Sequence, residues 1–378
     1  MTELDNILKK KLWLIENKKQ KREIVPVYRH DGVYINRNDK ELISFCCNDY
    51  LGLAADARVN EASRKAIEKY GCGAGASRLV SGDCELYTEL EGLLAEACGT
   101  EAACVFGSGY LANIGIIPAI VGRHDLIITD RLVHACIIDA ARISGADMLR
   151  FSHNNIEHCR MLLAENRADY QNCLIISEKI FSMDGDMAHL DEFGKLAREY
   201  NAFLMADCAH NTIFFRDNIF GEYDNVSIKM GTLSKAIGGY GGYVCGSKIL
   251  IDYLRNSARS FIFSTGLPPA VIASAIEALK IIKDNPNIGE KPIENARIFT
   301  DSLGLPQAQS TIVPLVLQEN EKTLEASKLL AENGFLVSAI RPPTVPENTA
   351  RLRFTFSALH NEEQIVRLCN VIKKQGWI

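Results

Sequence analysis

The sequence predicts an α/β protein with a large domain built on a mostly parallel β-sheet and a smaller α+β domain at its C-terminal end. Short apolar runs alternate with helical stretches through the middle of the chain, which is typical of a parallel sheet covered by helices on both faces. Nine of the eleven prolines lie after residue 267, so the last third follows a different pattern. With 378 residues, 47% of them apolar, the chain is long enough for two or three domains or subdomains.

The N-terminal 22 residues predict an amphipathic helix. Leu4, Leu8, Leu12 and Ile15 recur at helical spacing, and seven Lys and Arg side chains accompany only three acidic ones. We expect this basic helix to lie on the surface of the body of the protein or of a second subunit.

The central region predicts strands and helices in alternation. After a hairpin over 33–35 and 42–45, short apolar runs predict buried strands at 102–106, 126–129, 174–177, 202–206 and 226–230. Helical patterns lie between or before them at 85–97, 110–121, 135–143 and 191–200.

A break at Asn285-Pro286-Asn287 and Pro292 separates the last third of the chain. Beyond it we expect helices at 293–303 and 324–333, strands at 311–317, 336–339 and 352–356, and a final helix. The predicted organisation is an N-terminal helix, arm and hairpin over 1–47, a large domain over 48–284 and a small domain over 285–378.

Composition disfavours several classes of function. The net charge of −5 disfavours a nucleic-acid partner, and no apolar run reaches the roughly 18–20 residues of a membrane helix. The twelve cysteines show no C-x-x-C spacing, so we expect no metal site, and the chain is too long and apolar for a disulfide scaffold. We expect reduced thiols that fill apolar space in a cytoplasmic protein.

Candidate functional residues follow the predicted strands, because ligands bind beyond the carboxyl ends of parallel strands. Gly107-Ser108-Gly109-Tyr110 follows the first run and opens a helix, whose free backbone N–H groups favour a phosphate. Asp207 and His210 follow the fourth run. Thr232 and Lys235 follow the fifth, and the glycines after Lys235 indicate a lysine that a ligand approaches closely.

Each feature alone has a plainer interpretation, namely a turn, a helix-capping aspartate and a solvated lysine. Together, a phosphate cradle, a carboxylate and an imine-forming lysine favour pyridoxal phosphate (PLP) chemistry. A second interpretation is an NAD-dependent dehydrogenase, because Gly107, Gly109 and Ala112 fit G-x-G-x-x-A and Asp130 lies about 20 residues further on. That alternative leaves Lys235 without a role.

Several motifs then resemble a known family. Thr232-Leu233-Ser234-Lys235 and Asp207-Cys208-Ala209-His210 resemble the signatures of PLP enzymes of the aspartate-aminotransferase fold type, fold type I. The resemblance narrows to the α-oxoamine synthases at Asn48-Asp49-Tyr50-Leu51-Gly52-Leu53, Ser81-Gly82, Phe181-Ser182-Met183-Asp184-Gly185-Asp186 and Ser264-Thr265. The run Arg341-Pro342-Pro343-Thr344-Val345-Pro346 is most similar to the biotin-pathway member of that family.

The resemblance covers nearly the whole chain and implies a seven-stranded, mostly parallel sheet, PLP as cofactor and a homodimer with a shared active site. The implied reaction joins L-alanine to a pimeloyl thioester, on coenzyme A or acyl carrier protein, with loss of carbon dioxide. Alternatives within the family are 5-aminolevulinate synthase, 2-amino-3-oxobutyrate CoA ligase and serine palmitoyltransferase. A catalytically silent binding subunit is another alternative, which the intact Lys235, Asp207 and His210 disfavour.

The resemblance also implies roles for individual residues. Lys235 would form the imine with PLP and act as the base at Cα, Asp207 would pair with the pyridine nitrogen, and His134 would stack on the ring. The other implied cofactor contacts are Gly109, Tyr110, Ser182, His210, Thr232 and, toward the neighbouring subunit's phosphate, Ser264 and Thr265. The implied substrate contacts are Asn48, His134, Thr344, Arg341 for the amino-acid carboxylate, and Arg22 for the far end of the acyl chain. For His134 and Arg22, a helix-start histidine and one more charge on a basic helix are the plainer interpretations.

Two positions depart from the family pattern. Cys208 stands where an acid is usual, and Tyr87 stands where a histidine is common after Ser81-Gly82. These departures leave the details of the pocket and the acyl preference open.

Overall fold

The structure is a computed structural model that describes residues 2–215 and 225–378. The chain divides into two compact units. The large unit combines Asn48–Ser182 with Asp186–Lys291, and the small unit combines Met1–Cys47, Met183–Gly185 and Pro292–Ile378. No helix in the described residues is long and apolar enough to cross a lipid bilayer.

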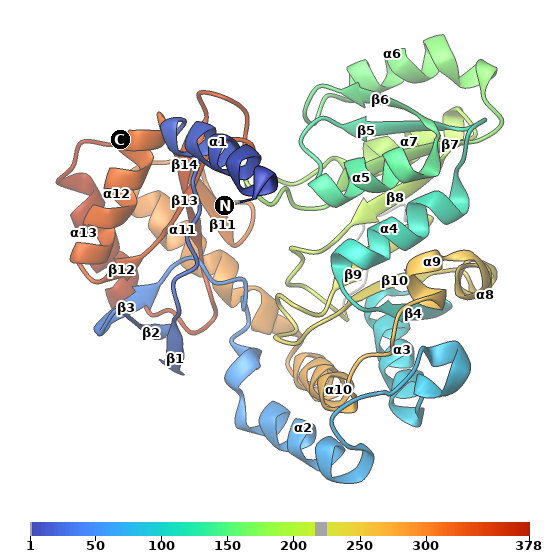
Figure 1. Cartoon of the computed structure of the whole chain (residues 1–378), viewed down its shortest axis with the longest axis horizontal. Helices are drawn as coiled ribbons and strands as arrows, with labels where there is room; N and C mark the ends of the chain where they lie inside the picture. Colours follow the sequence, from blue (N-terminus) through green and yellow to red (C-terminus); the bar gives the residue numbers. More distant parts are fainter. Residues whose placement is uncertain (1, 216–224) are drawn as a thin grey trace. The chain divides into compact units, whose positions relative to one another are not determined.

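The large unit is built on a seven-stranded sheet with the strand order β4-β10-β9-β8-β7-β5-β6 (Figure 1). Five strands coincide with the predicted apolar runs: β4 (Ala102–Phe106), β5 (Leu126–Asp130), β7 (Cys173–Glu178), β8 (Phe203–Asp207) and β9 (Ile228–Thr232). β10 runs antiparallel to β4 and β9, and the remaining pairs are parallel. The prediction of a mostly parallel seven-stranded sheet is therefore confirmed.

The sequence pattern missed two strands of this sheet, β6 (Asp147–Phe151) and β10 (Gly242–Gly246). β6 is an edge strand that is buried only at its last residue, so it has no continuous apolar run. β10 is fully buried but begins and ends with glycine, which reads as a turn signal in a sequence.

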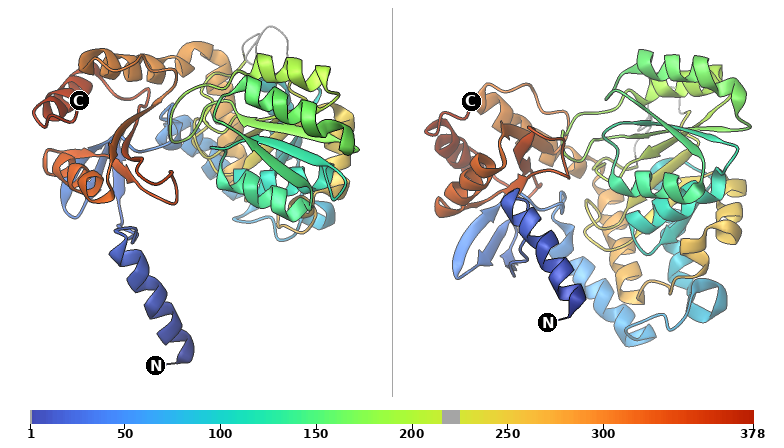
Figure 2. Two further views of the ribbon diagram at one scale, coloured as in Figure 1. Left: turned by 90° about the horizontal axis from the view of Figure 1, so that it is seen from above. Right: turned by 45° about the horizontal axis from the view of Figure 1, so that its top comes forward.

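Helices cover both faces of this sheet (Figure 2). One face packs against α4 (Gly109–Ile120), α5 (Ala135–Ser144), α8 (Lys248–Ser257) and α9 (Arg259–Ile262). The other face packs against α3 (Glu85–Cys98), α10 (Pro269–Asp284), α6 (Ile156–Asn166) and α7 (Leu190–Glu199). Successive side chains of β5 point to opposite faces of the sheet. Ile127 packs in the core on the face covered by α4 and α5, whereas Leu126 and Ile128 pack in the core on the face covered by α6 and α7. α2 (Ala57–Tyr70) packs on α10.

The small unit holds two sheets around one core. The first sheet contains β1 (Tyr28–Asp31), β2 (Tyr34–Arg37), β3 (Lys40–Ser44) and β12 (Phe335–Leu336). The second contains β11 (Ile312–Gln318), β14 (Ala350–Thr355) and β13 (Ser338–Ile340). α11 (Lys291–Leu303), α12 (Asn320–Glu332) and α13 (Glu362–Lys373) complete the unit. The large unit also contains four short helical turns: η1 (Leu53–Ala55), η2 (Arg78–Gly82), η3 (Arg167–Asp169) and η4 (Pro286–Gly289).

The single strand predicted at 336–339 is wrong, because the chain changes sheets there. β12 pairs in parallel with β3, whereas β13 pairs antiparallel with β14. Val337, between the two strands, is buried in the shared core.

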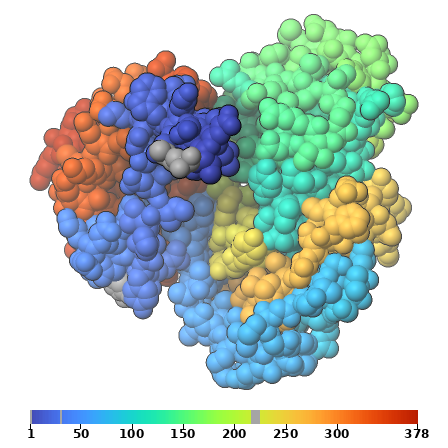
Figure 3. Space-filling view, in the orientation of Figure 1, coloured from blue at the N-terminus to red at the C-terminus, as the bar shows by residue number. Residues whose placement is uncertain are grey.

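The predicted N-terminal helix is α1 (Glu3–Asn17), which begins at a capping box formed by Thr2 and Asp5. In the described chain no side chain of α1 is buried, and its apolar residues, such as Leu8, Leu12 and Trp13, are exposed. α1 extends away from the rest of the small unit in Figure 2 and lies uncovered, in dark blue, in Figure 3. The predicted docking onto the body is therefore not seen within this chain.

The cysteines behave as small apolar residues. All twelve fall in the described residues, and none of them forms a disulfide there. Eight of the twelve are buried, and Cys72 is the one cysteine of the twelve that is exposed.

Candidate active site

A pocket of about 190 Å³ opens at the carboxyl end of the large sheet, at β7, β8 and β9. It brings together seven residues that the sequence singled out: Gly109, Tyr110, His134, Asp207, His210, Thr232 and Lys235. Four further residues line it: Cys136, Glu178, Ala209 and Met230.

Lys235 stands at the end of a chain of polar side chains. Its Nζ lies 2.8 Å from His210 Nε2, and His210 Nδ1 lies 2.6 Å from the Tyr50 hydroxyl. Tyr50 in turn donates to Asn48 Oδ1 at 3.1 Å. His210 and Tyr50 are buried, so the position of the lysine amine is set by groups that have little freedom to move.

Asp207 is the last residue of β8 and is 4% exposed. Its Oδ1 accepts from the Ala209 N–H at 2.9 Å, and its Oδ2 accepts from Asn113 Nδ2 at 3.0 Å. Asn113 Nδ2 also lies 3.1 Å from Cys136 Sγ. Asn113 is not among the residues predicted from the sequence, although it is the one polar residue between Leu111 and Ile120 of α4.

Glu178 is a second buried carboxyl beside Asp207 and was also missed. Its Oε1 accepts from the His134 N–H at 2.6 Å, and its Oε2 accepts from the Ser182 N–H at 3.2 Å. Burial, with the Asp207 charge, raises the pKa of Glu178 to about 8, although Lys235 opposes the shift. Glu178 ends β7, so the rule that found Asp207 at the end of β8 could have found it.

His134 is the N-cap residue of α5, where its Nδ1 accepts from the Cys136 N–H at 3.2 Å. Burial lowers the pKa of His134, and Asp207 only partly opposes this shift. A neutral imidazole at the wall of the pocket is suited to stacking on an aromatic ring.

The start of α4 forms one side of the pocket. Ser108 caps this helix, and Thr232 lies against Gly109 while donating from Oγ1 to the Gly241 carbonyl at 2.8 Å. Tyr110 donates from its hydroxyl to Asp139 Oδ2 at 2.6 Å. A helix N-terminus beside hydroxyl groups is a favourable place for a phosphate.

The glycines after Lys235 have a reason other than the predicted approach of a ligand. A Cβ atom on Gly238 would lie 2.6 Å from the Ala54 nitrogen, and one on Gly242 would lie 2.4 Å from the Ser108 carbonyl oxygen. Gly238 also has a φ of +75°. Backbone packing in the protein itself therefore requires these two glycines.

Several predicted residues do not line this pocket in the described part of one chain. Ser182 does not line it but donates from its N–H to Glu178, which does, and Ser264 and Thr265 line a smaller pocket with Arg78 and Tyr87. Arg22, Arg341 and Thr344 belong to the small unit. There Arg22 donates to Thr344 Oγ1 at 3.2 Å, and Arg341 donates to the Lys19 carbonyl at 2.6 Å.

Comparison with known proteins decides the family. The family model of aminotransferase class I and II matches residues 40–372. The chain belongs to this family. The 8-amino-7-oxononanoate synthase of Beijerinckia indica is 46% identical over 377 residues, 98% of each chain. That of Methylocella silvestris is 48% identical over 345 residues, 90% of this chain and 99% of the relative.

Solved structures of this family share the fold. The serine palmitoyltransferase of S. paucimobilis with a bound PLP–myriocin aldimine has a TM-score of 0.91 at 28% identity, covering 99% of this chain and 97% of that one. The 8-amino-7-oxononanoate synthase of Francisella tularensis has a TM-score of 0.74 at 27% identity, covering 88% and 97%.

The family and the site together overturn the dehydrogenase alternative. Asp130, which that alternative requires for a ribose, is fully buried and accepts from the backbone N–H groups of Leu132 and Asn154 at 2.8 and 2.7 Å. The pocket residues instead fit PLP. Lys235 presents an amine for the aldehyde, Asp207 presents a fixed carboxylate for the ring nitrogen, and the start of α4 presents N–H groups for the phosphate.

Proposed function

We propose that the chain is an 8-amino-7-oxononanoate synthase, which joins L-alanine to a pimeloyl thioester and releases carbon dioxide and the carrier thiol. One observation carries the proposal: Lys235, Asp207 and His210 meet in one pocket of a chain that is 46% and 48% identical to two synthases of that name. An intact set of these three side chains argues against a catalytically silent subunit.

The residues of the pocket divide the chemistry among them. When bound, PLP supplies an aldehyde that forms an imine with an amine and a ring that draws electrons away from the substrate Cα. Lys235 would provide the amine that holds the cofactor, and would take the proton from the substrate Cα and return it at the end of the reaction. Asp207, held by Asn113 and the Ala209 N–H, keeps a proton at the ring nitrogen. His210 would hydrogen-bond the ring hydroxyl, and His134 would stack on the ring.

The remaining cofactor contacts are proposed from the phosphate side of the pocket. Gly109 and Tyr110 at the start of α4 would bind the cofactor with Thr232. Ser182, whose N–H donates to the pocket residue Glu178, is proposed as a further cofactor contact. Ser264 and Thr265 lie outside the pocket within the described chain, which supports a homodimer in which each chain offers them to its partner.

Two guanidinium groups of the small unit support an anionic substrate. Burial, and then the charge of Arg22, lower the pKa of Arg341, so the two cations lie close enough to repel each other. Such a pair favours an anion. We assign Arg341 to the alanine carboxylate and Arg22, with Thr344, to the far end of the pimeloyl chain. Asn48, which is linked to Lys235 through Tyr50 and His210, is a further proposed substrate contact.

The acyl carrier and the compartment are also proposed. The exposed lysines of α1 and of the segment directly after it suit an acidic acyl carrier protein, and twelve cysteines without a disulfide suit the cytoplasm. Replacing Lys18, Lys19 and Lys21 with Glu should slow turnover with the acyl carrier protein and leave turnover with the coenzyme A thioester unchanged. Equal effects on both donors would remove the carrier protein from the proposal.

The cofactor assignment is tested by trapping. Purified protein should be yellow, and borohydride should fix the chromophore to the peptide that contains Lys235, as peptide mass mapping would show. Lys235→Ala should abolish turnover and covalent trapping while some PLP remains bound. Lys248→Ala, at an exposed lysine of α8, is the matched control and should leave both unchanged. A colourless protein that binds NAD would overturn the assignment.

The substrate assignment is tested by a matrix of amino acids and thioesters. L-Alanine, glycine and L-serine are each combined with pimeloyl, succinyl, acetyl and palmitoyl donors. Alanine with the pimeloyl donor should give the highest kcat/KM. The palmitoyl–serine combination is included because a serine palmitoyltransferase matches the fold with a TM-score of 0.91. A preference for that combination, or for glycine with the succinyl donor, would overturn the assignment.

A further inference from the structure

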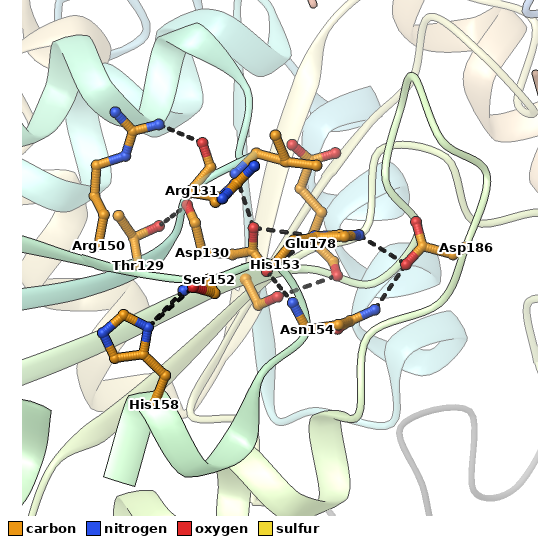
Figure 4. Close-up of polar contacts among 12 residues, drawn as sticks. Thr129, Asp130, Arg131, Arg150, Ser152, His153, Asn154, His158, Glu178 and Asp186 are labelled. Carbon is orange, nitrogen blue, oxygen red and sulfur yellow. Dashed lines mark hydrogen bonds and ion pairs between the residues drawn. The ribbon is translucent and has the colours of Figure 1, made fainter. Parts of the chain in front are cut away.

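His153 lies between two carboxylates of the large unit (Figure 4). It follows β6 directly, and its Nδ1 lies 3.1 Å from both side-chain oxygens of Asp130. Its Nε2 lies 2.9 Å from Asp186 Oδ2. Because both ring nitrogens face carboxylate oxygens, both must donate, and only the imidazolium form can do so.

The charge state of His153 agrees with this geometry. Burial by itself would lower the pKa of His153, but the hydrogen bonds to Asp130 and Asp186 outweigh it and raise that pKa to about 10. The charged groups that face the ring are Asp130 from the end of β5 and Asp186 from the connection after β7. The ring also packs edge-on against Phe181, with centroids 4.3 Å apart.

Asp186 belongs to the segment 179–188 that connects β7 to α7, which we call the 179–188 hairpin. Phe181 N–H donates to the Asp186 carbonyl at 3.0 Å, and Ala188 N–H donates to the Lys179 carbonyl at 3.1 Å. Asn154 donates from Nδ2 to Asp186 Oδ2 at 2.7 Å and to the Met187 carbonyl at 3.0 Å. His153 and Asn154 thus fasten the hairpin to the edge of the sheet at β5 and β6.

The same hairpin reaches the cofactor pocket. It begins directly after Glu178 and carries Ser182, whose N–H donates to Glu178 Oε2 at 3.2 Å. The other oxygen of Glu178 accepts from the His134 N–H at 2.6 Å. A displaced hairpin would therefore move Ser182 and disturb the support of two pocket residues, Glu178 and His134.

We infer that His153, held as an imidazolium between Asp130 and Asp186, is a positioning residue that places Ser182 and Glu178 at the cofactor pocket. His153 itself does not line that pocket in the described residues. The inference rests on the proposed function, because it assumes that the pocket binds PLP.

The test compares His153→Gln, Ser182→Ala and the double variant. His153→Gln keeps a hydrogen-bonding side chain but cannot carry the charge. The Kd of the apo-protein for PLP is measured by absorbance titration, and the Tm of each apo-protein is recorded. His153→Gln should weaken PLP binding about tenfold. This is the size expected if the displaced Ser182 loses a hydrogen bond to the charged cofactor. The double variant should bind PLP no more than about twofold less tightly than whichever single variant has the higher Kd. The reason is that both changes remove the same contact of Ser182 with the cofactor.

Two outcomes overturn the inference: unchanged PLP affinity in His153→Gln, or additive losses in the double variant, which would mean that His153 acts independently of Ser182. The matched control is His158→Gln. His158 Nδ1 accepts from the Ser152 N–H at 3.0 Å in the same connection between β6 and α6, so its loss should leave PLP affinity unchanged. An equal loss in this control would also overturn the inference.

A second variant covers the case in which His153→Gln does not fold. Asp186→Asn removes one charge of the clamp at a side chain that is 28% exposed, and it should weaken PLP binding in the same direction. Unchanged affinity there would overturn the inference. Failure of the proposed function looks different, since the wild-type apo-protein would then bind no PLP at all.

Discussion

Asn113 Nδ2 lies 3.0 Å from Asp207 Oδ2, although the two residues are 94 positions apart in the chain. Asn113 is fully buried on α4, and Asp207 ends β8. The contact explains how a carboxylate can be buried at the pocket wall: each of its oxygens receives one donor, Asn113 on one side and the Ala209 N–H on the other. A rigid aspartate is what the ring nitrogen of PLP needs.

Asn113→Leu should destabilise the apo-protein and weaken PLP binding. The leucine fills similar space but leaves Asp207 Oδ2 without its donor, which costs roughly 1–3 kcal/mol. Urea unfolding measures the first effect and PLP titration the second. Asn295→Leu is the matched control, since Asn295 is equally buried and donates to two carbonyl groups in the small unit. It should lower stability while leaving the Kd for PLP unchanged. Equal PLP affinity in both variants would contradict the role of Asn113.

Glu178 should make stability depend on pH. Its pKa is raised to about 8 in the folded apo-protein and is ordinarily 4.5. Between these values the folded state keeps a proton that the unfolded state has lost, so the free energy of unfolding falls as pH rises, by up to about 1.4 kcal/mol per pH unit. Glu178→Gln lacks this titration. The stability of wild type relative to Glu178→Gln should therefore decline from pH 5 to pH 8 in urea unfolding. A difference that stays constant over this range would contradict the prediction.

Cys208 should be chemically inert, despite its place between Asp207 and Ala209. It is buried, and burial raises the pKa of its thiol, so little reactive thiolate forms. Iodoacetamide at pH 8 should label the exposed Cys72 in the native protein and leave Cys208 unlabelled, as mass spectrometry of peptides would show. Unfolded protein serves as the control and should be labelled at both. Rapid native labelling of Cys208 would show that it is accessible after all.

Tyr87→Phe should lower the free energy of unfolding by roughly 1–3 kcal/mol. The Tyr87 hydroxyl accepts from the buried Leu267 N–H at 2.6 Å, and phenylalanine would leave that donor unsatisfied. The ring would still stack under the Arg78 guanidinium, which lies 3.7 Å from its centroid. Tyr70→Phe, at an exposed hydroxyl, is the control and should change stability much less. Equal effects in urea unfolding would show that the Leu267 contact contributes little.

Residues at strand ends show how far sequence reasoning reaches. Asp207, Thr232 and Lys235 were found because each follows an apolar run, and parallel strands present their carboxyl ends at one edge. Glu178 follows the same rule and could have been predicted. The contacts of Asn113 with Asp207 and of Tyr50 with His210 could not have been predicted. They join segments of the chain whose packing against each other is not indicated by any local pattern.

Sequence pattern does not reveal every reason for a residue. The glycines after Lys235 predict the close approach of a ligand, and the structure adds that backbone atoms of Ala54 and Ser108 require Gly238 and Gly242. The strand predicted at 336–339 is two strands in different sheets. A run of apolar residues indicates that a segment is buried, but it does not indicate which strand the segment pairs with.

Sequence alone predicts the alternation of strands and helices, the edge of the sheet where the chemistry lies, and the lysine and aspartate that suit PLP. These follow from periodicity and motif, which are local properties of a chain. The folded structure is needed to show which side chains hold that lysine and aspartate in place, and that His153 lies between Asp130 and Asp186. Such contacts join residues that are distant in sequence, and they arise only when packing brings their elements together. The parallel sheet predicted at the outset thus proves to be the frame of the pocket, while the buried polar contacts around it fix the geometry of the site.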